Sequence, residues 1–244
     1  MLQAEFIGEL LGTMTLIIFG SGVVASTLLN KSKGQSGGWM AITTGWAMGV
    51  FIGVFVAQST GSSQADINPA ISLAKYVMGI AYFAPHELLT AISAQLIGAF
   101  CGGVFVWLVY YPHWEATENA DYKLAVFCTQ PAIRRLPFNF LTEMLATLVL
   151  VLGVGAIDAI NRNTAMHPGF APYCVAMLVW GIGLSLGGPT GYAINPARDL
   201  GPRLCHAVLP IPQKRNADWG YAWVPVLGPF VGATLGALIW QVIF

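Results

Sequence analysis

Six long stretches with almost no charge decide what this chain can fold into. Five contain no Asp, Glu, Lys or Arg, and the sixth is interrupted by Glu143 alone; they cover residues 10–30, 34–65, 88–111, 136–157, 168–197 and 219–244. A helix needs roughly 20 apolar residues to cross the hydrocarbon core of a bilayer. The sequence therefore predicts an all-α membrane protein with six transmembrane helices.

The low charge content excludes several other classes of protein. Only 9% of the 244 residues are charged, against about 25% in soluble domains, so the chain cannot cover a water-facing surface. A formal net charge of zero argues against a nucleic-acid partner. The four cysteines show no C-x-x-C spacing, which argues against a metal site or a disulfide framework. No nucleophile–base pair is evident, so we expect neither an enzyme nor a cofactor.

The second half of the chain repeats the first at an offset of 134 residues. The matched positions are Glu9 and Glu143, Thr13 and Thr147, Trp46 and Trp180, Gly49 and Gly183, Gly98 and Gly232, and Gly102 and Gly236. Three spans in each half make the halves insert in opposite directions, an inverted repeat typical of transport proteins. We expect one domain over residues 1–244, with halves 1–111 and 136–244 joined by a hydrophilic loop at 112–135. The paired glycines four residues apart predict close helix crossings.

One tetrapeptide occurs in both halves. Ile67-Asn68-Pro69-Ala70 and Ile194-Asn195-Pro196-Ala197 lie 127 positions apart, each after an uncharged stretch rich in Gly, Ser and Thr. Asn favours the N-cap of a helix, and Pro favours its first turn. Each copy therefore predicts a loop that turns into a short helix within apolar sequence. In an inverted repeat, these two re-entrant half-helices enter from opposite faces and meet at mid-membrane.

Such a meeting point has the chemistry of a pore for neutral molecules. Non-helical backbone at membrane depth is tolerated where it lines a watery cavity, so its carbonyls can accept hydrogen bonds from a hydroxylated solute. Two helix N-termini aimed at one point, together with the amides of Asn68 and Asn195, repel cations and protons. The predicted pore carbonyls belong to Gln64, Ala65, Asp66, Ile67, Gly191, Ala193 and Ile194.

Glu9 and Glu143 are carboxylates inside predicted spans. Intramembrane carboxylates are candidates for proton relays or ion sites. Their duplication also fits a scaffold role, in which each accepts hydrogen bonds from loop N–H groups that otherwise lack partners. We favour the scaffold role, and the relay stays open.

Arg198 and Asp199 follow the second motif directly. A guanidinium in the first turn of a helix opposes the local dipole, so Arg198 has no stabilising reason to lie there. Lining a pore with its five donors gives it one. Asp199 either holds the turn or pairs with a nearby cation.

At these residues the chain resembles the major intrinsic protein (aquaporin) family, over essentially its whole length, and within it the bacterial aquaglyceroporins or glycerol uptake facilitators. The specific motif is Gly191-Tyr-Ala-Ile-Asn195-Pro-Ala-Arg198-Asp199-Leu-Gly201-Pro202-Arg203. The resemblance implies an aquaporin-like fold and a passive channel for glycerol and related small neutral solutes such as water, dihydroxyacetone and urea. It also implies a homotetramer in the lipid bilayer of a bacterial plasma membrane, with both termini cytoplasmic.

That orientation conflicts with the distribution of basic residues. It places seven Lys and Arg residues outside and only Lys75 and Arg162 clearly inside, whereas the positive-inside rule predicts the reverse. The paired half-helix pattern is the more specific signal, and we expect the family orientation.

The resemblance also assigns an outer constriction, the selectivity filter, to Trp46, Gly183, Tyr192 and Arg198. Water-selective members have Phe and His at the first two of these positions. Gly183 removes the bulk of that His, Trp46 and Tyr192 offer aromatic faces to a carbon backbone, and Arg198 binds hydroxyls.

Two departures from the family pattern bear on the substrate. Tyr192 stands where glycerol facilitators commonly have Phe, so undissociated lactic acid is an alternative preferred solute. Asp66 stands in place of a His; its carboxylate either attracts protons at the pore entrance or is a buried partner for a loop donor. An alternative from another class is a proton-coupled secondary transporter that uses Glu9, Asp66 or Glu143.

Overall fold

The computed structural model describes residues 2–164, 166–167 and 169–243, and in these ranges it is built from helices without strands. The outer ends of the two predicted halves, residues 1 and 244, lie outside the described residues. The helices are α1 (Leu2–Leu28), α2 (Gly38–Ser59), α3 (Pro69–Met78), α4 (Pro85–Val109), α5 (Tyr111–Ala116), α6 (Ala120–Phe127), α7 (Leu136–Thr164), α8 (Phe170–Leu186), α9 (Pro196–Val208) and α10 (Trp219–Ile243).

Six of these helices form the bundle that the apolar stretches predict. Helices α1, α2, α4, α7 and α10 are long and apolar enough to cross a membrane. The sixth, α8, is shorter, with 17 apolar residues, which lies at the lower limit of roughly 17–25 residues for a spanning helix. The predicted all-α fold with six membrane helices is confirmed.

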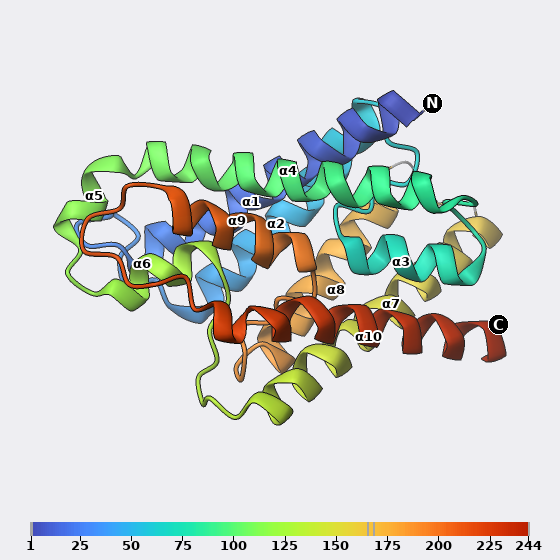
Figure 1. The fold of residues 1–244 in the computed structure, drawn as a ribbon. Coiled ribbons are helices and arrows are strands. Elements are labelled where there is room, and N and C mark those ends of the chain that lie inside the picture. Colours follow the sequence, from blue (N-terminus) through green and yellow to red (C-terminus); the bar gives the residue numbers. More distant parts are fainter. Residues whose placement is uncertain (1, 165, 168, 244) are drawn as a thin grey trace.

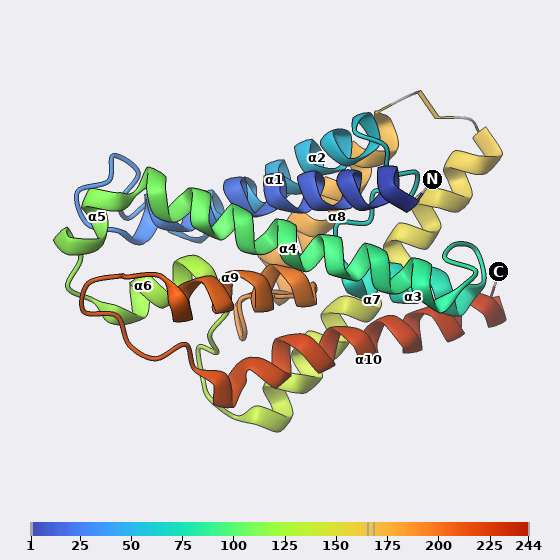
Figure 2. The same ribbon diagram turned by 45° about the horizontal axis from the view of Figure 1, so that its top comes forward.

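The two half-helices α3 and α9 begin near the middle of the bundle and run in opposite directions (Figure 1). Helix α3 runs toward the end of the bundle that holds both chain termini, which we call the termini end. Helix α9 runs toward the opposite end, which we call the far end (Figure 2). Each starts as predicted, with an Asn in extended conformation as N-cap and a Pro in the first turn.

The inverted repeat extends to atomic contacts between helices. A Cβ added to Gly98 of α4 would lie 2.2 Å from the carbonyl oxygen of Leu10 in α1. A Cβ on Gly232 of α10 would lie 2.1 Å from the carbonyl oxygen of Met144 in α7. Both partners are again 134 residues apart, so the same crossing occurs twice, and the predicted close approach of these helices is confirmed.

The connection between the halves is more ordered than the predicted hydrophilic loop at 112–135. It contains α5 and α6, and α6 packs against α1 and α9 at the far end. Trp114 and Phe127 explain this difference, because their rings are buried and stack with centroids 5.5 Å apart. The ammonium of Lys123 also donates to the carbonyl of Pro212, at 2.5 Å. The connection therefore covers the far end.

The crossing glycines give a test of the repeat. We expect Gly232→Leu to destabilise the protein by about 3 kcal/mol or more, because its side chain has to displace backbone rather than a flexible neighbour. Thermal unfolding of the purified protein in detergent measures this effect. Gly181→Leu is the matched control, since a Cβ at Gly181 has no atom within 4 Å. Equal melting temperatures for the two variants would contradict the assigned crossing.

Candidate functional site

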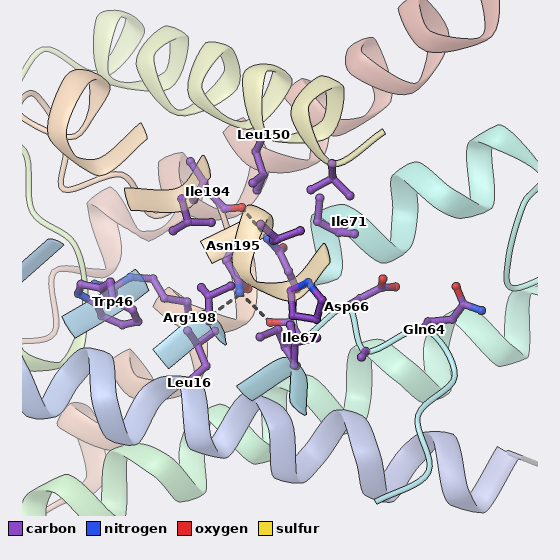
Figure 3. A pocket seen from close by; sticks show the side chains of 18 of the residues that line it. Leu16, Trp46, Gln64, Asp66, Ile67, Ile71, Leu150, Ile194, Asn195 and Arg198 are labelled. Carbon is purple, nitrogen blue, oxygen red and sulfur yellow. Dashed lines mark hydrogen bonds between the residues drawn. The ribbon is translucent and has the colours of Figure 1, made fainter. Parts of the chain in front are cut away.

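The two re-entrant loops meet through a reciprocal pair of hydrogen bonds. The Asn68 side-chain amide donates to the carbonyl of Ile194 at 2.9 Å, and the Asn195 amide donates to the carbonyl of Ile67 at 2.8 Å (Figure 3). The Oδ1 atoms of both Asn residues accept backbone N–H groups of their own half-helices. An amide nitrogen carries two hydrogens, so each Asn keeps one donor for a solute.

The loop backbone before each Asn adopts an unusual conformation in both halves. Ala65 and Ile67 have φ angles of 47° and 48°, and Tyr192 and Ile194 have 39° and 44°. This left-handed region costs a non-glycine residue about 1–2 kcal/mol. The two pairs are related by the 127-residue offset of the motifs. Strain repeated at matching positions indicates that the conformation is held in place by surrounding contacts.

Buried carboxylates supply those contacts. Glu9 accepts the backbone N–H groups of Asp66 and Ile67 at 2.7 and 2.8 Å. Glu143 accepts those of Ala193 and Ile194, both at 3.0 Å. Both glutamates are fully buried, and charge-assisted hydrogen bonds of this kind are among the stronger ones in proteins. These contacts are those that the scaffold role requires.

Two cavities approach the loops from opposite ends. The one at the termini end has a volume of about 150 Å³ and is lined by Asn68 and Asn195 (Figure 3). The one at the far end has a volume of about 290 Å³. Trp46, Tyr192 and Arg198 line both, so three of the four predicted filter residues form the boundary between the cavities, and the fourth, Gly183, is among the lining residues of neither.

The filter residues are tightly packed. The Arg198 guanidinium lies over the Trp46 ring, 3.9 Å from its centroid, a cation–π contact. It therefore occupies an aromatic face that the sequence analysis assigned to the solute. A Cβ on Gly183 would lie 2.7 Å from Cζ of Tyr192, so the phenol fills the space that Gly183 leaves. Among the described residues, neither the Tyr192 hydroxyl nor Nη1 of Arg198 has a hydrogen-bond partner, and both atoms are buried at the constriction.

The predicted pore carbonyls divide between the two cavities. Gly191 lines the far cavity, and the other six residues line the cavity at the termini end: Gln64, Ala65, Asp66, Ile67, Ala193 and Ile194. The carbonyls of Ile67 and Ile194 already accept an Asn amide, so each keeps one lone pair for a solute. The motif residues Pro69, Ala70, Pro196 and Ala197 are buried in the first turns of α3 and α9.

Comparison with known proteins agrees with this geometry. The family model described as "Major intrinsic protein" matches residues 1–240. The chain belongs to the major intrinsic protein family. Within this family, aquaglyceroporins are channels rather than enzymes.

Individual relatives extend this result. A "Probable glycerol uptake facilitator protein" of Thermotoga maritima is 50% identical over 99% of this chain and 100% of its own length. A "D/L-lactic acid transporter" of Lactiplantibacillus plantarum is 39% identical over 96% of this chain and 94% of its own. The crystal structure of the aquaglyceroporin from Plasmodium falciparum matches with a TM-score of 0.86 at 28% identity, covering 100% of this chain and 97% of that one.

Asp66, the second departure from the family pattern, is a buried partner rather than a free carboxylate. It forms an ion pair with Lys75 at 2.5 Å and accepts hydrogen bonds from the hydroxyls of Ser72 and Tyr82 at 2.9 and 2.7 Å. The side chain of Asp66 is 1% exposed, and its carboxylate is enclosed by donors. The structure therefore favours a buried partner over a carboxylate that attracts protons at the pore entrance.

Asp199 pairs with a nearby cation, which is one of the two roles that the sequence analysis left open for it. Its carboxylate accepts from Nε of Arg203 at 2.7 Å and from the backbone and hydroxyl of Thr129 at 2.8 and 2.7 Å. Since Thr129 lies in the connection between the halves, Asp199 ties that connection to the half-helix α9.

The sequence analysis did not predict a role for two residues near the site, Trp39 and Gln95. Trp39 donates its indole N–H to the carbonyl of Gly183 at 3.0 Å, and its ring meets that of Tyr192 edge-on, with centroids 5.7 Å apart. Gln95 donates to Glu9 at 2.7 Å and to Ser72 at 3.0 Å. Gln95 could have been predicted, because a polar amide within the apolar stretch 88–111 needs a hydrogen-bond partner. The role of Trp39 could not have been predicted from local sequence, because its partners Gly183 and Tyr192 lie far away along the chain.

The carboxylate anchors are testable by an isosteric change. We expect Glu143→Gln to lower stability by about 2 kcal/mol, because the new NH₂ group faces a backbone donor and leaves it unsatisfied. Thermal unfolding in detergent measures the loss. Thr142→Val, which removes an exposed hydroxyl bonded within its own helix, is the control. A Glu143→Gln protein as stable as this control would refute the anchoring role.

Proposed function

We propose that the chain is a passive channel for glycerol and related small neutral solutes, among them water, dihydroxyacetone and urea, and that it excludes ions and protons. The observation that supports this most is the boundary between the two cavities, where Trp46, Tyr192 and Arg198 lie beside Gly183. Aromatic rings, an unpartnered hydroxyl and a guanidinium together suit a molecule with a carbon backbone and several hydroxyls. The names of the glycerol facilitators among the relatives agree with this proposal.

The wall of the pore at the termini end is amphipathic, which also suits a polyol. One part of the lining comes from the re-entrant loops, with their carbonyls and the amides of Asn68 and Asn195. Another part is aliphatic and comes from membrane helices: Leu16, Val50, Val54, Leu150, Val154, Val175 and Val179. A polyol can direct its hydroxyls to the loops and its carbon atoms to the helices, so that no polar group is left without a partner.

A proton-coupled transporter is the less suitable reading, because the three carboxylates it would use are engaged. Glu9 and Glu143 hold loop N–H groups, and Asp66 holds an ammonium and two hydroxyls. Protonating any of them would remove acceptors that the strained loops require. A channel, by contrast, needs these groups only as fixed parts of the wall.

We further infer a single channel domain over residues 1–244, in a bacterial plasma membrane and with both termini cytoplasmic. Both termini lie at one end of the bundle (Figures 1 and 2), as an even number of spans requires. The bacterial relative supports the membrane. From the family we infer a homotetramer with one pore in each protomer.

Stopped-flow light scattering on proteoliposomes tests the proposed function. We expect fast glycerol entry that rises linearly with the glycerol gradient and is indifferent to pH and to a proton gradient, because diffusion through a pore has no coupled ion. Empty liposomes are the control. Fast lactic acid entry at low pH with slow glycerol entry would make the protein a weak-acid channel instead, and saturation at low glycerol with proton dependence would indicate a transporter.

A second experiment tests the filter. We expect Gly183→Val to slow glycerol entry by roughly tenfold or more, because the new side chain competes with the Tyr192 ring for the same space, and to slow water less. The same substitution at Gly181, which has no atom within 4 Å of an added Cβ, should leave both rates unchanged. Unchanged glycerol entry in Gly183→Val would remove Gly183 from the constriction.

A further inference from the structure

Each re-entrant segment, taken as the loop with its half-helix, carries one buried ion pair, but the two pairs have different surroundings. In α9, Asp199 and Arg203 pair at 2.7 Å, and both side chains are fully buried. The remaining donors of Arg203 bind the carbonyls of Ala217, Asp218 and Thr129. Neither member of this pair is among the residues that line the two cavities, so it acts away from the path of the solute.

The other pair, between Asp66 of the first re-entrant loop and Lys75 of α3, lies in the pore wall. Lys75 lines the cavity at the termini end, and its side chain is 12% exposed against 1% for Asp66. Asp66 is enclosed by Ser72 and Tyr82. Both members line this cavity, but the carboxylate of Asp66 is shielded by its partners, and the ammonium of Lys75 is the more exposed of the two.

The Lys75 ammonium is fixed where it lies. Besides its ion pair with Asp66 it donates to the carbonyl and to the side-chain oxygen of Gln64, both at 3.3 Å. An ammonium has three donors, and these three contacts use all of them. Lys75 therefore contributes to the pore as a charge held in one position, not as a donor for passing solutes.

A negative charge lies at the same mouth. Asp158 of α7 lines the cavity together with Lys75 and interacts with it electrostatically. Without Lys75, this mouth would hold two carboxylates, Asp66 and Asp158, and clefts lined by charge of one sign concentrate counter-ions. Lys75 offsets one of these two negative charges and so weakens the attraction of this mouth for cations.

We propose that Lys75 is a specificity-determining residue, a fixed cation that excludes small cations from the pore at the termini end. It acts in series with Arg198, which lines the same cavity where it meets the filter. This inference rests on the proposed path of the solute through that cavity. Lys75, the two half-helix N-termini and Arg198 act in series on a cation, so the contribution of Lys75 is measured against a pore in which Arg198, the strongest local positive charge of the filter, has been replaced.

The test compares two probes of nearly the same shape that differ in charge. Guanidinium is a permanent cation at neutral pH, and urea is its neutral counterpart. Proteoliposomes with Arg198→Ala and with Arg198→Ala/Lys75→Met are assayed for uptake of both. We expect the double variant to raise the ratio of guanidinium to urea uptake by roughly tenfold over Arg198→Ala. Arg198→Ala/Lys75→Arg, which keeps the positive charge, should behave like Arg198→Ala.

Lys75→Met leaves Asp66 buried without its counter-charge, which can impair folding. A second comparison removes that carboxylate from both variants: Arg198→Ala/Asp66→Asn is compared with the same protein that also carries Lys75→Met. We expect Lys75→Met to raise the ratio of guanidinium to urea uptake in this background as well. Glycerol entry into the same vesicles shows that the pore is intact, so a failure of the channel proposal is seen separately. An unchanged ratio in vesicles that pass glycerol would overturn the role of Lys75.

Discussion

A backbone that leaves helical structure inside a membrane has to satisfy its N–H groups without water, and the architecture of this protein follows from that requirement. Glu9 and Glu143 each accept two consecutive loop N–H groups. With these anchors in place, the neighbouring residues can hold left-handed conformations, and their carbonyls can line a cavity. The apolar bundle around the loops supplies the aliphatic part of the pore wall. The two carboxylates hold in place the loop backbone that supplies its polar part.

Much of this arrangement was predictable because it depends on local sequence. Uncharged stretches predict spans, as for α2 (Gly38–Ser59), which lies within the uncharged stretch 34–65. An Asn-Pro pair predicts the start of a half-helix, and the 134-residue repeat predicts both crossings at Gly98 and Gly232. What remained hidden depends on contacts between distant residues. Trp39 reaches a carbonyl 144 positions away, and α5 and α6 are too short to show a periodicity of their own.

The two halves share a framework but not the details that face the solute. Their membrane helices match at an offset of 134, whereas the re-entrant loops match at 127. Asp66 lies in the first loop and accepts from Ser72 of its half-helix, whereas Asp199 lies in α9 and accepts from Thr129 of the connection between the halves. Duplication accounts for the scaffold, and later divergence accounts for an ion pair that lines the pore in one half and lies away from the cavities in the other.

The reciprocal amide bonds also constrain how the protein is made. The partners of Asn68 and Asn195 lie 126 and 128 residues away in the sequence. Chains are synthesised at roughly 5–20 residues per second, so the first loop waits several seconds for its partner to leave the ribosome. Glu9, in contrast, precedes the first loop in the chain and can bind its N–H groups during that interval. The bonds between the two loops form only after the second loop has been inserted, so the assembly of the pore is a late event.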